Sequence, residues 1–429
     1  MKLFSLFNLN QGIVMQKFLK YTLIVCFLVF SQSSRADVWK SANNHWNFDW
    51  EDKYRNWVTK EWKPDFFMNK KKRPQYYRIP HDCADAIYLM RAVFSYENKL
   101  PFKIHYLARK NKYISNTMRN WDKLPQSQRF RKFAKFLIDR VGTRTFYRDS
   151  FPIALADIKA GDLYAQPGSH SYAINGITET GVLAIMSSTT PSAPKNMIQL
   201  YSFPFFIPHD TVGMTDGYRR FMWPRNIDKP VQQQPGFSRE QYQIAQKVGL
   251  NYIPFTDIIA KKLQRRKEPL EEKTMRLMHS LCSFAKERVN YVNDGLAYLG
   301  RLKKQGKRQC MNAAEYDYYS TPSRDKRLFR FFTEVYNIAY AGGKLTEDEV
   351  NAQILARSIF HPVLPDGLLK ELDDFCGLPI YPGNDRKHIN LRQLWKSLEA
   401  RKLSSDPHAP FIYRWGLTDK KYVGSCKTF

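Results

Sequence analysis

The chain has 429 residues, of which 43% are hydrophobic and 15% are aromatic. This composition can build folded cores and excludes a chain that is disordered throughout. The 68 Lys and Arg outnumber the 40 Asp and Glu, which gives a formal net charge of +28 and favours anionic partners. The nine His are scattered and no two Cys are two residues apart, so we predict neither a metal site nor any other cofactor.

The first 36 residues have the order of a secretory signal. Lys17 and Lys20 precede an unbroken apolar run over residues 21–30, and Ser34 and Ala36 place small residues where a signal peptidase cuts. A membrane-spanning helix needs about 20 apolar residues, roughly twice the length of this run. We therefore expect cleavage after Ala36 and a mature protein in the periplasm or outside the cell.

Cysteine usage separates one thiol from the rest. Cleavage removes Cys26, and Cys83 is then the one cysteine of the N-terminal half. The other four are Cys282, Cys310, Cys376 and Cys426. In an oxidising compartment an even set can pair, although the sequence does not say which cysteines pair with which. Cys83 is then left over, as a free reactive thiol or an intermolecular link.

Residues 37–230 mix helical and strand patterns and predict an α+β domain. Residues 80–102 predict a helix flanked by prolines, and residues 116–141 predict a basic helix. Short apolar runs separated by glycines predict strands over residues 158–188. Residues 227–237 concentrate Pro and Gln and predict a linker.

Residues 231–429 have helical signals and predict an all-α domain. Ser238 and Gln241 fit a capping box, and residues 267–306 predict one or two long helices. Thr321 precedes a proline, and Thr346 precedes three acidic residues, and both patterns indicate helix starts. We expect this basic domain to be stapled by disulfides.

Cys83 lies in the first turn of the helix predicted over residues 80–102. The positive end of a helix dipole lowers the pKa of a thiol and makes the thiolate available as a nucleophile. The alternative is that Cys83 is a small buried hydrophobic residue, which is the usual state of a free cysteine.

His170 is the base that we expect beside this thiol. A strand over residues 161–165 is followed by a Pro-Gly turn, and a second strand opens with His170. Tyr172 and Ile174 share a face with His170, because side chains alternate along a strand. A polar group on the following strand could fix the tautomer of the imidazole.

These motifs resemble the NlpC-type cysteine peptidases, papain-like enzymes that cut the peptide stems of bacterial cell walls. The resemblance covers residues 80–191 and rests on an Asp-Cys pair opening a helix, on Gly-Asp-Leu-Tyr, and on the His-led hairpin. It implies a papain-like fold for residues 37–230, with Cys83 as nucleophile and His170 as base. The third polar residue of the family falls near Ile185, which cannot orient an imidazole, and Ser187 is the nearest polar substitute.

Two further groups of residues are predicted to contact substrate. Tyr164 and Tyr172 are expected in the core or in the lining of the cleft. Arg219, Arg220 and Trp223 interleave charge and aromatic surface, which suits a clamp for sugars or carboxylates. The same pattern suits a basic edge strand packed under the linker, and the sequence leaves both interpretations open.

The sequence therefore predicts an exported cysteine hydrolase that cleaves amide bonds in peptidoglycan stem peptides. Peptidoglycan or another anionic envelope polymer is the expected partner, and contact with a membrane surface stays open. One alternative is an acyltransferase or amidase for lipid substrates on the same fold, since fold does not fix function. Another is a non-catalytic basic protein that binds the envelope. Binding of extracellular nucleic acid is a third and weaker alternative, because the chain is predicted to be exported.

Overall fold

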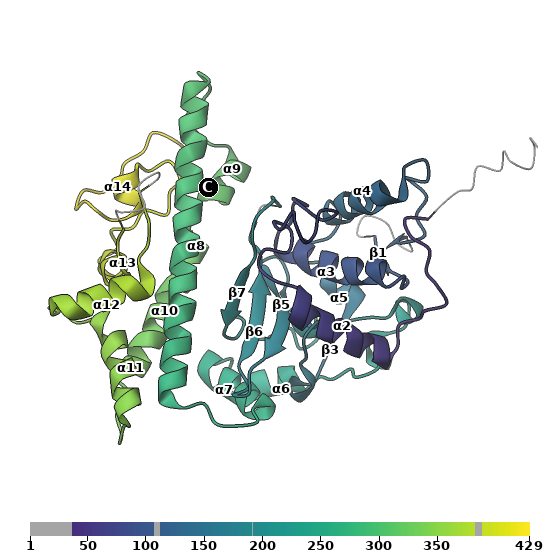
Figure 1. Cartoon of the computed structure of the whole chain (residues 1–429), viewed down its shortest axis with the longest axis horizontal. Helices are drawn as coiled ribbons and strands as arrows, with labels where there is room; N and C mark the ends of the chain where they lie inside the picture. The colour runs from purple at the N-terminus through teal and green to yellow at the C-terminus, as the bar shows by residue number, and fades with distance from the viewer. Residues whose placement is uncertain (1–36, 107–111, 191, 382–387) are drawn as a thin grey trace, which may run out of the picture.

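The computed structural model describes residues 37–106, 112–190, 192–381 and 388–429. The predicted export signal, including Cys26, lies outside these residues. The N-terminal half is a mixed α/β structure built on a sheet, and the C-terminal half is helical, as Figure 1 shows. This coarse division confirms the prediction from the sequence.

A six-stranded antiparallel sheet forms the centre of the N-terminal half. Its strands follow the spatial order β3-β8-β4-β5-β6-β7. Their bounds are β3 (Ser150–Pro152), β4 (Leu163–Gln166), β5 (His170–Ile177), β6 (Leu183–Ser187), β7 (Ile198–Tyr201) and β8 (Gly217–Phe221). A separate hairpin pairs β1 (Lys103–His105) with β2 (Tyr113–Ser115). The strands predicted over residues 158–188 are thus β4, β5 and β6.

Helices of the N-terminal half cover one face of the sheet. They are α2 (Phe48–Glu61), α3 (Cys83–Glu97), α4 (Gln126–Ile138) and the single turn α5 (Phe146–Asp149). Leu163, Ala165 and Ala173 point into this aromatic-rich core. Their neighbours Tyr164 and Tyr172 point into a second core on the other face, as the alternation of side chains requires.

The C-terminal half packs on this other face. Its helices are α6 (Glu240–Lys247), α7 (Tyr252–Leu263), α8 (Leu270–Lys304), α9 (Ala313–Tyr319), α10 (Pro322–Ala339), α11 (Glu347–Ser358), α12 (Asp366–Cys376), α13 (Leu391–Glu399) and α14 (Phe411–Arg414). The long helix α8 stands between the sheet and the outer helices (Figure 1). The helices α11 and α10 start where predicted, with Thr346 as N-cap and Pro322 as first residue. Thr346 also forms a capping box, whereas the side chain of Thr321 makes no cap bond to α10.

The segment after β8 does not behave as a free linker. Phe237 forms a bridge with Ile153 beside β3. The capping box predicted for Ser238 and Gln241 is wrong, because α6 begins after Arg239 without a side-chain cap. The Gln241 amide instead bonds both backbone groups of Tyr218, at 2.8 and 2.9 Å. One hydrophobic core therefore runs from the sheet through α6 and α7 into the C-terminal helices, across the domain boundary expected at residue 230.

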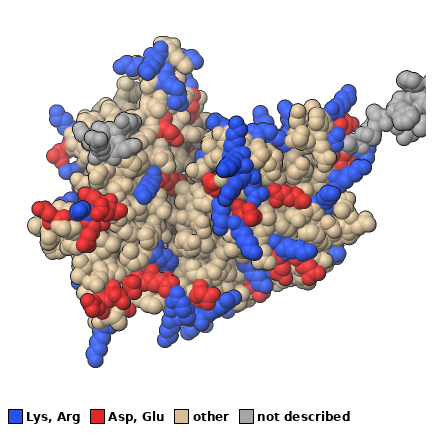
Figure 2. All heavy atoms as spheres, in the orientation of Figure 1, with Lys and Arg blue, Asp and Glu red and all other residues tan. Residues whose placement is uncertain are grey.

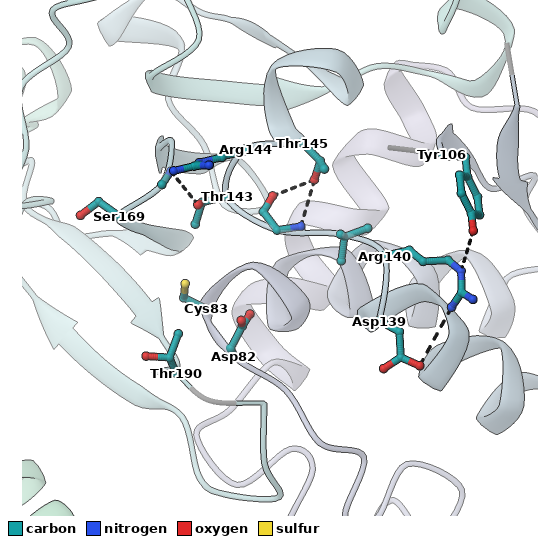
Figure 3. Close-up of a pocket in the computed structure, with 13 residues that line it drawn as sticks. Asp82, Cys83, Tyr106, Asp139, Arg140, Thr143, Arg144, Thr145, Ser169 and Thr190 are labelled. Carbon is teal, nitrogen blue, oxygen red and sulfur yellow. Dashed lines mark hydrogen bonds and ion pairs between the residues drawn. The ribbon is translucent and has the colours of Figure 1, made fainter. Parts of the chain in front are cut away.

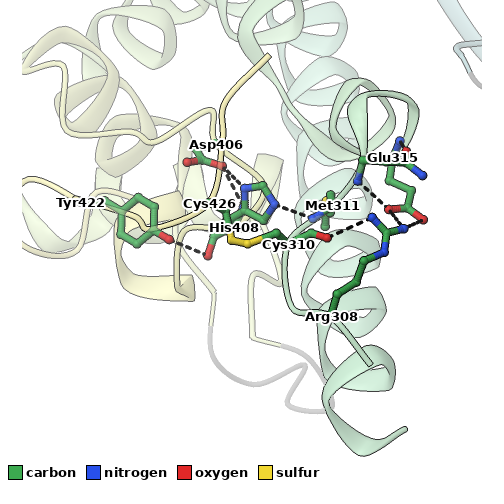
Figure 4. The surroundings of a disulfide bond; sticks show 9 residues. Arg308, Cys310, Met311, Glu315, Asp406, His408, Tyr422 and Cys426 are labelled. Atoms are coloured by element: carbon green, nitrogen blue, oxygen red, sulfur yellow. Dashed lines mark hydrogen bonds and ion pairs between the residues drawn. A yellow bond between two sulfur atoms is a disulfide. The ribbon is translucent and has the colours of Figure 1, made fainter. Parts of the chain in front are cut away.

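Two disulfides staple the C-terminal half. Cys282 of α8 is bonded to Cys376 of α12, and Cys310 is bonded to Cys426 near the C-terminus (Figure 4). Cys83 is the one free cysteine of the described residues, which confirms the prediction that the other four pair and leave Cys83 over. Two disulfides indicate an oxidising compartment, consistent with export. Among the described helices, none has the length and apolar character needed to cross a membrane.

A buried ion pair links the first two helices of the N-terminal half. Arg91 of α3 donates to both carboxylate oxygens of Glu51 on α2, at 2.5 and 3.1 Å. The indole of Trp223 donates to the same carboxylate at 2.8 Å, and the Arg91 guanidinium lies over the Trp46 ring. Removing one partner of such a pair leaves the other charge buried without compensation.

We predict that Glu51→Ala lowers the free energy of unfolding by about 3 kcal/mol or more, because Arg91 is then buried unpaired. Urea denaturation followed by circular dichroism measures this. Asp52→Ala is the matched control, since Asp52 is adjacent and exposed, and its loss should cost under about 1 kcal/mol. Equal losses in the two variants would contradict the prediction.

Candidate active site

Cys83 is the first residue of α3, as the sequence predicts. Asp82 caps this helix by accepting from the backbone amides of Ala84 and Asp85, and the Asp85 carboxylate accepts from the Asp82 amide in return. The cap uses the amides that follow Cys83 and not the amide of Cys83 itself. Asp82 therefore has a structural role as the cap of α3, and its carboxylate acts on the neighbouring thiol.

The thiol lies at a pocket of about 830 Å³, which we call the thiol pocket. It is lined by Asp82, Cys83, Tyr106, Asp139, Arg140, Val141, Gly142, Thr143, Arg144, Thr145, Gly168, Ser169 and Thr190. Figure 3 shows Cys83 among residues from the start of α3, the α4–α5 loop, the β4–β5 turn and the segment after β6. The side chain of Cys83 itself is only 4% exposed.

The pKa of the thiol moves in the direction opposite to the one predicted from the helix dipole. Burial most of all, and then the Asp82 carboxylate, raise the pKa of Cys83 to about 11, although the hydroxyl and backbone amide of Ser171 act to lower it. Desolvation penalises a thiolate more than the dipole of one helix end stabilises it. In this structure Cys83 is therefore a neutral thiol at pH 7.

His170 is the first residue of β5, and its imidazole is held by β6. Its Nε2 lies 2.7 Å from the Ser187 hydroxyl, and that hydroxyl donates to the Ser188 carbonyl at 3.1 Å. Because the hydroxyl hydrogen is used by Ser188, the Ser187 oxygen accepts from Nε2–H. This arrangement leaves Nδ1 of His170 as the unprotonated nitrogen, which is the form that a general base requires.

The pKa of His170 is well below its ordinary value. Burial lowers this pKa most, and the nearby positive charges of Arg327 and Arg324 lower it further. The ring packs edge-on against Tyr172, with 4.6 Å between the ring centroids. At neutral pH the imidazole is therefore uncharged.

No hydrogen bond joins Cys83 to His170 among the described residues, and the two side chains lie on opposite faces of β5, because His170 packs with Tyr172. The thiol lies beside Ser171, the residue that follows His170 on β5. His170 lines a second pocket, and Gly168, Ser169 and Thr190 belong to the walls of both pockets. The two cavities therefore adjoin along the β4–β5 turn, with the thiol in one and the imidazole in the other.

This second cavity, of about 560 Å³, is called here the arginine pocket. Its lining residues are Gly168, Ser169, His170, Thr189, Thr190, Phe205, Phe206, Asp317, Ser320, Pro322, Ser323, Arg324, Lys326, Arg327 and Arg330. Most of its charged residues come from the first turns of α10. In the sequence, residues 320–325 indicate only a helix cap. These arginines could not be predicted as site residues, because no local pattern connects them to a histidine more than 150 residues earlier.

Tyr164 and Tyr172, predicted to lie in the core or in the cleft lining, are core residues. Both are at most 1% exposed and pack in the core between the sheet and the C-terminal half. Their side chains line neither the thiol pocket nor the arginine pocket.

Arg219, Arg220 and Trp223 are engaged in structural contacts. Arg219 is buried and donates to the hydroxyl and carbonyl of Ser150. Arg220 forms a bidentate pair with Asp162, and Trp223 bonds Glu51 as described above. The strand that carries Arg219 and Arg220 is β8, which lies inside the sheet between β3 and β4 rather than at its edge.

Basic side chains are spread over the molecule. Figure 2 shows Lys and Arg over both halves of the visible face, while acidic side chains gather over α11 and α12. Within the residues described, no group of His, Cys, Asp and Glu is arranged to hold a metal ion.

Comparison with known proteins gives no match: no family model, no curated protein and no solved structure is significantly similar to this chain. The resemblance to NlpC-type peptidases therefore stays a prediction from the motifs.

We predict that Asp82→Asn speeds alkylation of Cys83 in the folded protein. The change removes the charge that raises the thiol pKa, and asparagine still caps the helix, so the rate at pH 8 should rise roughly threefold to tenfold. Iodoacetamide labelling under non-reducing conditions, read by mass spectrometry, reports this one thiol. Asp139→Asn, which removes a charge from the same pocket, is the control, and an equal change in both would refute the role of Asp82.

Proposed function

We propose that this protein is an exported cysteine hydrolase in which Cys83 is the nucleophile and His170 is the general base. One observation carries the proposal: the free thiol opens a helix at a pocket of about 830 Å³ and lies beside Ser171, which directly follows a histidine held by Ser187. A papain-like arrangement of helix, sheet and histidine is the form that the motif resemblance implies.

In the proposed reaction Nδ1 of His170 takes the thiol proton as Sγ of Cys83 attacks an amide carbonyl. The tetrahedral intermediate collapses to a thioester as the C–N bond breaks, and His170 returns the proton to the leaving amine. Water, deprotonated by the same nitrogen, then hydrolyses the thioester and regenerates the thiol. Ser187 keeps the second nitrogen protonated throughout and so fixes the tautomer.

The helix start also supplies a donor for the developing oxyanion. The Asp82 carboxylate accepts from the amides of Ala84 and Asp85, so the cap leaves the Cys83 amide for another partner. An amide at the positive end of a helix stabilises negative charge on an oxygen. A substrate carbonyl polarised there lies next to the attacking sulfur.

Peptidoglycan stem peptides are the proposed substrate. The support is the motif resemblance together with the predicted export signal, the two disulfides and the strongly basic chain. The walls of the thiol pocket contribute Arg140 and Arg144, which suit a substrate that carries carboxylates.

We predict that Cys83→Ala abolishes release of soluble peptide from purified cell-wall sacculi, because no other described residue in the pocket is a thiol. His170→Ala should lower the rate by at least about 100-fold, the usual contribution of a general base. Ser187→Ala should lower the rate less, since the imidazole is kept but its tautomer is no longer fixed by a hydrogen bond. Release is followed by chromatography of the soluble fragments.

Lys286→Gln, an exposed change on α8, is the control for these rates. Unchanged hydrolysis in Cys83→Ala would end the proposal. Release of fatty acid from liposomes, with no peptide from sacculi, would instead support the lipid amidase or acyltransferase.

A non-catalytic envelope-binding protein is the second candidate. It is favoured by the low exposure of Cys83 and its pKa of about 11, which are ordinary for a structural thiol. That function requires salt-sensitive binding to sacculi by the Cys83→Ala variant and no peptide release by the wild type.

A further inference from the structure

The arginine pocket is formed jointly by the two halves of the chain. The sheet side contributes His170 and the loop with Phe205, and α10 contributes cations on successive turns at Arg324, Arg327 and Arg330. Residues three apart on a helix lie on the same face, so these three side chains point to one side of α10. The motif resemblance does not extend to α10, which lies far beyond residue 191.

The guanidinium groups in this pocket are not saturated by the protein. Arg324 stacks on Tyr291, with 3.5 Å from its guanidinium carbon to the ring centroid, and donates to the Ser320 carbonyl at 2.7 Å. Arg330 donates to the Phe205 carbonyl at 2.8 Å. The buried Nε atoms of Arg324 and Arg327 have no hydrogen-bond partner among the described residues, which is costly for a charged donor.

Negative charge nearby does not balance these cations. Four cationic side chains line the pocket, against the single carboxylate of Asp317. Glu287 of α8 is buried near Arg324, Arg327 and Lys195, and Glu334 of α10 is buried near Arg330. Among the described residues, neither carboxylate lies within 4.0 Å of any of the four cations as an ion pair. The pocket therefore has unused positive charge and unused donors.

We propose that the arginine pocket is an anion subsite that binds a carboxylate of the substrate, next to the scissile amide held in the thiol pocket. A guanidinium presents a planar fork that matches a carboxylate, and Asp317 at the pocket disfavours a group with two negative charges, such as a phosphate monoester. This inference rests on the proposed function, and it deepens that function by assigning the C-terminal half a part in substrate recognition.

Binding of a carboxylate in the arginine pocket would also change the basicity of His170. Arg324 and Arg327 are the cations that disfavour protonated His170, and a bound carboxylate neutralises them. The imidazole then becomes a stronger base when the substrate is in place, so proton transfer from Cys83 is easiest in the complex.

The test measures equilibrium binding to the Cys83→Ala protein, which cannot turn substrate over. The probes are a soluble stem tripeptide with free carboxylates, the same peptide with its carboxylates amidated, and inorganic phosphate. We expect the free tripeptide to bind and Arg327→Gln to weaken its binding at least about tenfold, the loss of one charge-assisted hydrogen bond. Lys326→Gln, at an exposed position of the pocket, should weaken it less, and Lys286→Gln on α8 should change it under about twofold.

Three outcomes would overturn the subsite: tight binding of the amidated peptide, an Arg327→Gln protein that is folded and binds as before, or phosphate displacing the peptide while acetate does not. Lys326→Gln keeps the test informative if Arg327→Gln fails to fold. The proposed function fails separately, through hydrolysis that does not need Cys83, because binding is measured without turnover.

Discussion

The packing of the C-terminal helices on the outer face of the sheet determines what surrounds His170. Phe205, in the loop after β7, packs against Phe284 of α8 and Phe331 of α10, with ring centroids 5.7 and 5.0 Å apart. This apolar contact sets the register of α10 on the sheet, and it brings the arginines of α10 over His170. Without it the thiol pocket would remain, but the imidazole would face water.

The site combines two groups that the protein keeps neutral for opposite reasons. Burial and the Asp82 carboxylate disfavour the thiolate of Cys83, whereas burial and two arginines disfavour the imidazolium of His170. An ion pair of thiolate and imidazolium is therefore costly while the pockets are empty. A site of this kind protects its thiol from adventitious alkylation and oxidation, since both reactions need the thiolate.

Local sequence signals determined much of the framework. The odd cysteine, the helix that begins at Cys83, the strand that begins at His170 and the face that His170 shares with Tyr172 all follow from patterns within a few residues. Ser187 could be named because it is the polar residue nearest to the position near Ile185 that the motif resemblance implies, and its hydroxyl lies 2.7 Å from Nε2 of His170.

Long-range packing determined the rest. The disulfide partners are 94 and 116 residues apart, and no local pattern selects between the possible pairings. Tyr164, Arg219 and Trp223 look like cleft residues in sequence, but whether a side chain is buried depends on which distant element covers it. The prediction that the thiol pKa is lowered was wrong for the same reason. The helix dipole can be inferred from the sequence, whereas desolvation depends on distant packing.

The Cys282–Cys376 bond ties α8, the helix against the sheet, to the outer helix α12. Before this bond forms, the apolar outer face of the sheet depends on helices that are not yet covalently fixed. Neither helix lines the arginine pocket, so the bond acts on the helical half as a whole and not on the pocket itself. By closing a long loop, the crosslink restricts the unfolded chain, so the helical half resists unfolding better in an oxidising compartment than under reducing conditions.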